Sequence, residues 1–208
     1  MKEREKEFTT KKSEIFSREE FERFLREAPD EDYLLHKMFV IFGIYGTMRG
    51  NEIINMKITD VLIKENEIVV QVPEGKNRAR TFIITRHSDP SLDSINYVQK
   101  YLSLRPSIVK NNRFMIYMMN SKGVNRPVGR NRIGKITKDI ALYLGLEKER
   151  IDRFSGYTYK KTGLNLLNLA NMQESNDKKR SLSKMMVMGS DEFSYSPNKN
   201  KKINEDFH

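Results

Sequence analysis

The sequence predicts a mainly α-helical fold with a small antiparallel β-sheet, which is an α+β arrangement. Several segments repeat apolar residues at helical spacing, and residues 32–45 are apolar nearly all round, as in a buried core helix. Two β-branched runs, residues 68–72 and 81–85, flank a basic segment, and this pattern indicates a hairpin with a long tip. The chain has 208 residues and no internal repeat, which favours one domain or at most two.

The first helix has the most complete start signal in the chain. Ser17 and Glu20 form an S-x-x-E capping box, and Phe16 and Phe21 occupy the staple positions around it. The Ala-Pro-Asp sequence at residues 28–30 ends this helix. Further helices are expected at residues 51–56, 89–104, 131–144 and 159–171, and residues 114–117 are expected as a short strand or extended segment.

Three regions are expected along the chain. Residues 1–15 form a mixed-charge, disordered arm, residues 16–172 form the folded domain, and residues 173–208 form a polar C-terminal tail. No apolar run approaches the roughly 20 residues that a membrane helix needs, and the N-terminus lacks the apolar core of a secretory signal. The chain has no cysteine, which excludes disulfides and thiolate metal sites. We therefore expect an intracellular protein with no membrane partner, no metal and no cofactor.

The charge of the chain favours a polyanionic partner. The formal net charge is +10 and the isoelectric point is about 9.6, and neutralising phosphates with such a surface releases condensed counterions. Basic residues gather in residues 76–86 and 126–138, where they could form a surface that follows a phosphate backbone. Simple solvation of the surface is the alternative explanation.

Arg49 stands in the strongest local motif, between Gly46 and a short helix that begins near Asn51. An arginine at a glycine-flanked helix entrance can present its guanidinium to a phosphate beside free backbone N–H groups. The alternative is that Arg49 pairs with Glu52 across one helical turn.

The order of elements resembles the first half of a tyrosine recombinase (phage-integrase type) catalytic domain. The resemblance rests on the buried helix, the G-x-x-R-x-x-E-I motif at residues 46–53, Asp-Val at residues 60–61, and two strands with a lysine in the turn. It implies that Arg49 is the first catalytic arginine and that Glu52 is the acidic residue found three positions later.

The turn between the two strands supplies the catalytic lysine in this resemblance. Lys76 falls on that position, and Arg78 or Arg80 competes for the assignment. An ordinary solvated turn lysine is the alternative for Lys76.

The second half of the chain also resembles the family, most closely its Crypton-like eukaryotic branch. The resemblance rests on residues 124–129, 144–146 and 154–163. Family members carry His-x-x-Arg in the last of these segments, whereas this chain has Tyr157 and Lys160 in the two positions.

These two departures bear directly on the catalysis that the resemblance implies. In the family, two arginines clamp the scissile phosphate, a histidine and a lysine handle protons, and a tyrosine forms a 3′-phosphotyrosine link. Lysine cannot copy the bidentate fork of arginine, and tyrosine, with a pKa near 10, replaces histidine poorly at neutral pH. Removing such an arginine costs roughly 10³–10⁵ in rate in other phosphoryl transfers. We therefore expect severely weakened cleavage.

The nucleophile is expected in the tail. Gly189-Ser190 resembles the step that precedes the family's tyrosine, and Tyr195 is the only tyrosine downstream of it. Its distance from Gly189 is several residues shorter than in the family, so an aromatic residue in a flexible tail is the alternative reading.

Double-stranded DNA is the expected partner, with homo-oligomerisation on DNA and nuclear localisation in a eukaryote. Family members carry an additional N-terminal core-binding domain, which residues 1–15 do not supply, so we expect either a fragment or a protein that works without it. The residues expected to contact DNA are Arg49, Lys76, Arg78, Arg80, Arg130, Arg132 and Lys161.

Three functions remain open from the sequence. The first is a domesticated or impaired recombinase domain that binds DNA and cleaves it poorly or not at all. It is favoured by the retained Arg49 and Lys76, the basic charge, and the altered Tyr157 and Lys160. The others are an active recombinase that integrates or exchanges DNA strands, and a protein-interaction scaffold on the same fold.

Overall fold

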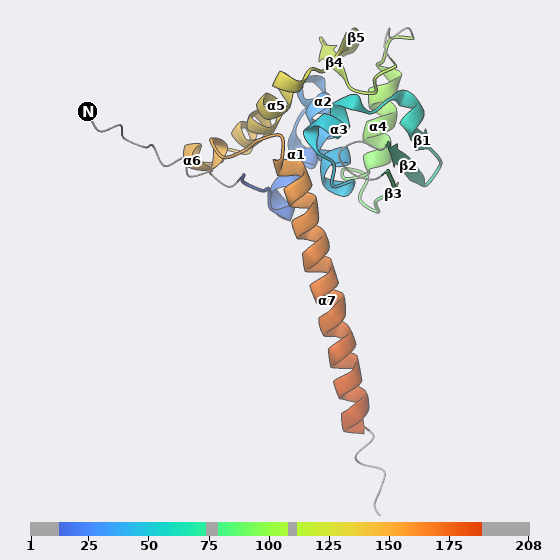
Figure 1. Cartoon of the computed structure of the whole chain (residues 1–208), viewed down its shortest axis with the longest axis vertical. Helices are drawn as coiled ribbons and strands as arrows, with labels where there is room; N and C mark the ends of the chain where they lie inside the picture. The colour runs from blue at the N-terminus through green and yellow to red at the C-terminus, as the bar shows by residue number, and fades with distance from the viewer. Residues whose placement is uncertain (1–12, 74–78, 108–111, 189–208) are drawn as a thin grey trace, which may run out of the picture. The chain divides into compact units, whose positions relative to one another are not determined.

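The computed structural model describes residues 13–73, 79–107 and 112–188. The chain divides into two compact units, residues 1–167 and 168–208. Helix α7 begins in the first unit and continues in the second (Figure 1). The described elements are α1 (Arg18–Glu27), α2 (Asp30–Val40), a π-helix (Ile41–Tyr45), α3 (Gly50–Asn55), a 3-10 helix (Ile58–Asp60), β1 (Val61–Ile63), β2 (Glu67–Val72), β3 (Arg80–Thr85), α4 (Ser94–Ser103), β4 (Ile116–Met119), β5 (Lys122–Pro127), α5 (Arg130–Tyr143), α6 (Lys148–Ile151) and α7 (Thr158–Met188).

The predicted capping box at the start of α1 is confirmed. The Glu20 backbone N–H donates to Ser17 Oγ at 3.1 Å, and the Ser17 N–H donates to Glu20 Oε2 at 2.9 Å. Phe16 and Phe21 are both buried in the core. The first helix therefore begins and ends where local sequence chemistry places it, since its C-cap is Ala28.

Helix α2 is the buried centre of the first unit. It packs against α1, α4, α5 and β4 (Figure 1). The sequence predicts one helix over residues 32–45, but the chain changes from α to π geometry at Ile41. Gly43 lies on the π-helix where α7 approaches, and a Cβ there would be 2.6 Å from Tyr159 Cβ. The π turn is not visible in apolar periodicity because residues 41–44 are all buried and apolar or glycine, so no polar face marks a period.

The three-stranded sheet has the order β1-β2-β3 and is antiparallel throughout. The two predicted strands are confirmed as β2 and β3, and β1 is an additional edge strand of three residues. Alternation sets the two faces: Ile68, Val70 and Ile84 are buried, whereas Leu62 and Ile83 are exposed. The tip that joins β2 to β3 includes Lys76 and Arg78, which lie outside the described residues.

The second sheet is a hairpin of β4 and β5. Sequence reasoning missed β5, whose glycine, asparagine and proline are poor strand formers. The turn explains why it forms: Asn120 and Ser121 both have positive φ, 48° and 59°. Two such residues are typical of the tight turn whose twist matches that of paired strands.

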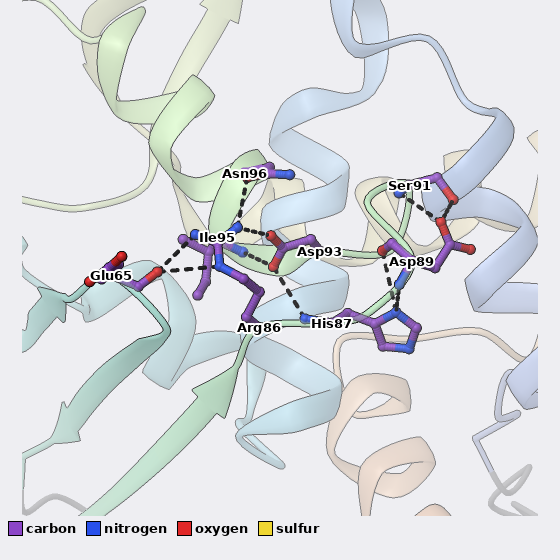
Figure 2. Close-up of polar contacts among 8 residues, drawn as sticks. All are labelled: Glu65, Arg86, His87, Asp89, Ser91, Asp93, Ile95 and Asn96. Atoms are coloured by element: carbon purple, nitrogen blue, oxygen red, sulfur yellow. Dashed lines mark hydrogen bonds and ion pairs between the residues drawn. The ribbon is translucent and has the colours of Figure 1, made fainter.

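Helix α4 begins at Ser94 rather than at the predicted residue 89. Asp93 caps it, because its Oδ1 accepts the Ile95 N–H at 3.2 Å. Figure 2 shows the hydrogen bonds of the segment before α4. The Arg86 guanidinium donates to the Glu65 carbonyl and to the buried Asp93 carboxylate, the latter at 2.6 Å. This network joins the end of β3 to the start of α4.

Helix α7 is longer than the sequence predicts. Its apolar repeat ends near residue 171, yet the helix continues to Met188. The polar residues after 171 are compatible with a helix but do not carry the periodic signal by which a helix is recognised. The predicted nucleophile, Tyr195, lies outside the described residues.

Candidate functional site

A pocket of about 330 Å³ lies where three segments of the first unit meet. They are the start of α3, the first turns of α5, and the turn between α6 and α7. The pocket contains two arginines, Arg49 and Arg130, and no acidic residue. The lining residues are Arg49, Gly50, Asn51, Arg130, Ile133, Gly134, Gly156 and Tyr157.

One isoleucine brings the three segments together. A Cβ on Gly50 would be 2.5 Å from Ile133 Cγ2, and a Cβ on Gly156 would be 2.8 Å from the same atom. Gly50 also donates its backbone N–H to the Gly156 carbonyl at 3.3 Å. Because real Cβ atoms do not approach so closely, a larger residue at either position would have to displace Ile133, and glycine lets the segments that carry Arg49 and Tyr157 meet at one pocket.

The turn before Arg49 is strained. Thr47 has a φ of 46°, which is unusual for a β-branched residue. The turn is held by hydrogen bonds from Met48 N to the Gly43 carbonyl at 3.0 Å and from Thr47 N to the Ile44 carbonyl at 3.2 Å. Strain of this kind occurs at functional sites, where the surrounding structure imposes it.

Glu52 organises the start of α3 without taking the Arg49 side chain as its ion-pair partner. Its Oε2 accepts the Arg49 backbone N–H at 2.7 Å. The guanidinium paired with Glu52 belongs to Arg80, with contacts of 2.9 and 3.3 Å to the two carboxylate oxygens. Arg80, predicted to contact DNA, is therefore tied to α3, and Arg49 is half-buried at the pocket.

Residues 13–16, which we call the N-terminal strap, pack against the turn that carries Tyr157 and form hydrogen bonds with it. Ser13 Oγ lies 2.9 Å from Ser155 Oγ and 3.2 Å from Thr158 Oγ1. Phe16 stacks on Phe154 with ring centroids 4.5 Å apart. The sequence assigns residues 13–15 to the arm, and no local signal reveals these contacts, whose partners are more than 130 residues away.

The other predicted site residues fall into three groups. Arg132 lies 3.5 Å from Asp139, and Lys161 Nζ donates to the Ser13 carbonyl at 2.6 Å, so both cations are engaged within the fold. Lys160 is half-buried and does not line the pocket. Lys76, Arg78 and Tyr195 lie outside the described residues. The structure thus brings together Arg49, Arg130 and Tyr157.

A polar cluster lies under α5. His36 Nε2 is 3.4 Å from Asp139 Oδ2, and Asp139 also contacts Arg132. Burial lowers the pKa of His36, against the opposing effect of Asp139. Nearby, burial raises the pKa of Tyr159, whose phenol is fully buried at the start of α7. None of these groups lines the pocket, although Arg132, Asp139 and Tyr159 belong to helices that border it.

The pocket has the chemistry of an anion site. Two guanidiniums offer forked donors that match the oxygens of a phosphate or carboxylate. In the described part of the chain, neither Arg49 nor Arg130 forms an ion pair, and no group of three histidine or acidic side chains gathers as metal ligands. No helix among the described residues is long and apolar enough to cross a membrane.

Two solved structures with a similar fold are both recombinases. The XerH site-specific recombinase, bound to its difH substrate in a pre-cleavage complex, matches with a TM-score of 0.54 and 18% identity over 77% of this chain and 44% of that chain. The XerA recombinase matches with a TM-score of 0.53 and 20% identity over 73% and 49% of the two chains.

These matches establish the fold. The chain has the fold of a tyrosine recombinase catalytic domain, mainly α with two small antiparallel sheets, which confirms the predicted fold class. It spans less than half the length of either matched protein. No protein-family model and no curated protein matches its sequence.

Proposed function

We propose that this chain binds double-stranded DNA through the phosphate backbone and that it cleaves DNA weakly or not at all. The observation that carries the proposal is the convergence of Arg49 and Arg130 on one pocket of a recombinase fold. The XerH structure of the same fold contains a DNA substrate.

The electrostatics of the chain support a phosphate ligand. The net charge of +10 favours association with a polyanion, and a pocket with two arginines and no carboxylate concentrates that charge at one point. Hydrogen bonds between guanidinium and phosphate are among the strong ones because both partners are charged. The pocket therefore suits a backbone phosphodiester.

Weak cleavage follows from the residues in the two altered positions. Tyr157 lines the pocket at the position where the family's histidine is expected, and the residue is 47% exposed. A phenol does not supply the acid–base function of an imidazole. Lys160 stands in place of the second arginine and offers a single ammonium instead of a planar fork.

The DNA-binding part of the proposal is tested with Arg49→Ala on a labelled generic duplex by fluorescence anisotropy. The control is Arg18→Ala, which removes the same charge from the exposed face of α1. We expect Arg49→Ala to weaken binding by about tenfold, as the loss of a charged hydrogen bond does, and Arg18→Ala to change it less than about twofold. Equal effects of the two variants would contradict a role for the pocket.

The cleavage part is tested by looking for an SDS-resistant protein–DNA adduct. The proposal predicts little or no adduct in the wild-type protein. An abundant adduct that disappears in Tyr195→Phe would instead support the active recombinase. Salt-insensitive association with DNA, together with a strong protein partner, would support the scaffold.

Further features of the protein belong to the same proposal. A DNA-binding role fits nuclear localisation in a eukaryote, descent from a Crypton-like transposon, and self-association on DNA. The motifs at residues 124–129 and 154–163 support the Crypton-like affinity. Lys76, Arg78, Arg80, Arg132 and Lys161 remain proposed DNA contacts beside the two arginines of the pocket.

A further inference from the structure

We infer that Arg130 supplies the second guanidinium of the phosphate site, in place of the residue at position 160. This inference rests on the proposed function, because it names which side chain completes the clamp with Arg49. The ligand that it implies is a single phosphodiester, held between the start of α3 and the start of α5.

The backbone geometry places the two arginines at the same pocket. Arg49 directly precedes Gly50, which packs against Ile133 so closely that a Cβ would be 2.5 Å from it. Ile133 stands three residues after Arg130 on α5, and residues at this spacing lie on the same face of a helix. One contact between α3 and α5 therefore brings both arginines to the pocket that they line.

Other cations on the surrounding elements have partners within the fold. Arg80 is held by both carboxylate oxygens of Glu52, Arg132 by Asp139, and Lys161 by the Ser13 carbonyl. Lys160 is not a lining residue. In the described part of the chain, Arg49 and Arg130 are thus the cations that face the pocket without a carboxylate partner.

The charges at the start of α5 favour binding of an anion and disfavour the helix itself. A cation in the first turn of a helix opposes the helix dipole, yet Arg130 is the first residue of α5, and its first turn contains no acidic residue. Gly129 provides no side-chain cap. An anion bound between Arg130 and Arg49 would offset the dipole conflict and neutralise positive charge at the pocket that both residues line.

A double-mutant cycle tests the inference on a labelled duplex. The variants are Arg49→Ala, Arg130→Ala and their combination, with Lys160→Ala beside them. The matched control is Lys135→Ala, which removes one charge from an exposed position of α5 outside the pocket. Residues that hold the same phosphate are coupled, whereas independent sites give effects that multiply.

We expect Arg49→Ala and Arg130→Ala each to weaken binding about tenfold. The combined variant should lose clearly less than the roughly hundredfold product of the two. Lys160→Ala and Lys135→Ala should each change affinity by less than about twofold.

Two results would overturn the inference while leaving DNA binding intact: Arg130→Ala behaving like Lys135→Ala, or Lys160→Ala weakening binding as much as Arg130→Ala. Absence of duplex binding by the wild-type protein would instead defeat the proposed function itself. A stability measurement distinguishes a lost phosphate contact from misfolding. Arg130→Glu should lower the affinity for DNA but raise the melting temperature, because an acidic side chain in the first turn interacts favourably with the helix dipole. A lower melting temperature would indicate that Arg130 has a structural role and would count against the clamp.

Discussion

Gly50 decides how closely α3 approaches α5, and with it the spacing of the two pocket arginines. The residue is buried, and the nearest atom to its missing Cβ belongs to Ile133. The sequence indicates a glycine-flanked entrance around Arg49. It gives no sign that a larger side chain at position 50 would meet Ile133, which lies 83 residues later. The packing partner is a property of the fold.

The first prediction is that Gly50→Ala destabilises the protein. The added methyl group overlaps Ile133, and overpacking of this kind typically costs about 1–3 kcal/mol in the free energy of unfolding. Urea denaturation followed by circular dichroism measures it.

Gly134 provides the matched control for Gly50. It lies inside α5, and a Cβ there has no atom within 4 Å. Gly134→Ala should therefore raise the free energy of unfolding by roughly 0.5–1 kcal/mol, because alanine loses less conformational freedom in a helix. A Gly50→Ala protein as stable as the wild type would show that α3 and α5 are not in close contact.

The second prediction concerns pH and His36. Burial lowers its pKa in the folded state below the usual value near 6.5. The unfolded chain therefore binds more protons between these two pKa values, so the free energy of unfolding falls as the pH is lowered from about 6.5. His36→Gln should remove this component, whereas His87→Gln, at an exposed position, should keep it. Identical pH profiles for wild-type and His36→Gln proteins would contradict the burial of His36.

At the scale of elements, the N-terminal strap secures the turn that carries Tyr157. Phe16 is 1% exposed and stacks on Phe154, and its backbone N–H donates to Thr162 Oγ1 on α7 at 3.1 Å. Residues 13–16 thus join the start of α1 to the start of α7. The sequence identifies Phe16 as a staple of α1, but the contacts with α7 connect the two ends of the domain and have no local pattern.

The third prediction is that Phe16→Ala lowers the free energy of unfolding by roughly 3–5 kcal/mol, as is usual for a buried phenylalanine. Tyr157→Ala is the control, because it removes an aromatic ring of similar size from the same turn at a position that is 47% exposed. Its cost should stay within about 1 kcal/mol. Chemical denaturation compares the two, and similar costs would mean that the strap does not hold the turn.

The elements themselves could be predicted where local chemistry decides them. The capping box of Ser17 and the alternating pattern of β2 and β3 are such cases. The start of α4 could not, because Asp93 serves at once as its cap and as the partner of Arg86, which directly follows β3. Strand β5 depends on the turn at Asn120 and Ser121 rather than on its own residues.

At the scale of the whole molecule, the order of motifs along the chain predicted the fold, which the similarity to XerH and XerA confirms. The candidate site was only partly predictable. Arg49 and Arg130 were both expected to contact DNA, as were Arg80 and Arg132, which carry the same charge. Ion pairs distinguish them: Arg80 is bound by Glu52, 28 positions away in the sequence, and Arg132 lies beside Asp139.

The charge distribution is the main support for the claim that the chain binds the backbone of duplex DNA and that its pocket holds one phosphate. The most direct test is the salt dependence of duplex binding, measured by fluorescence anisotropy for the wild-type protein and Arg49→Ala. Across about 50–200 mM salt, the account predicts a log–log slope of several units for the wild type, and a slope smaller by about one for Arg49→Ala. Flat or absent binding by the wild type, or equal slopes for the two proteins, would contradict it.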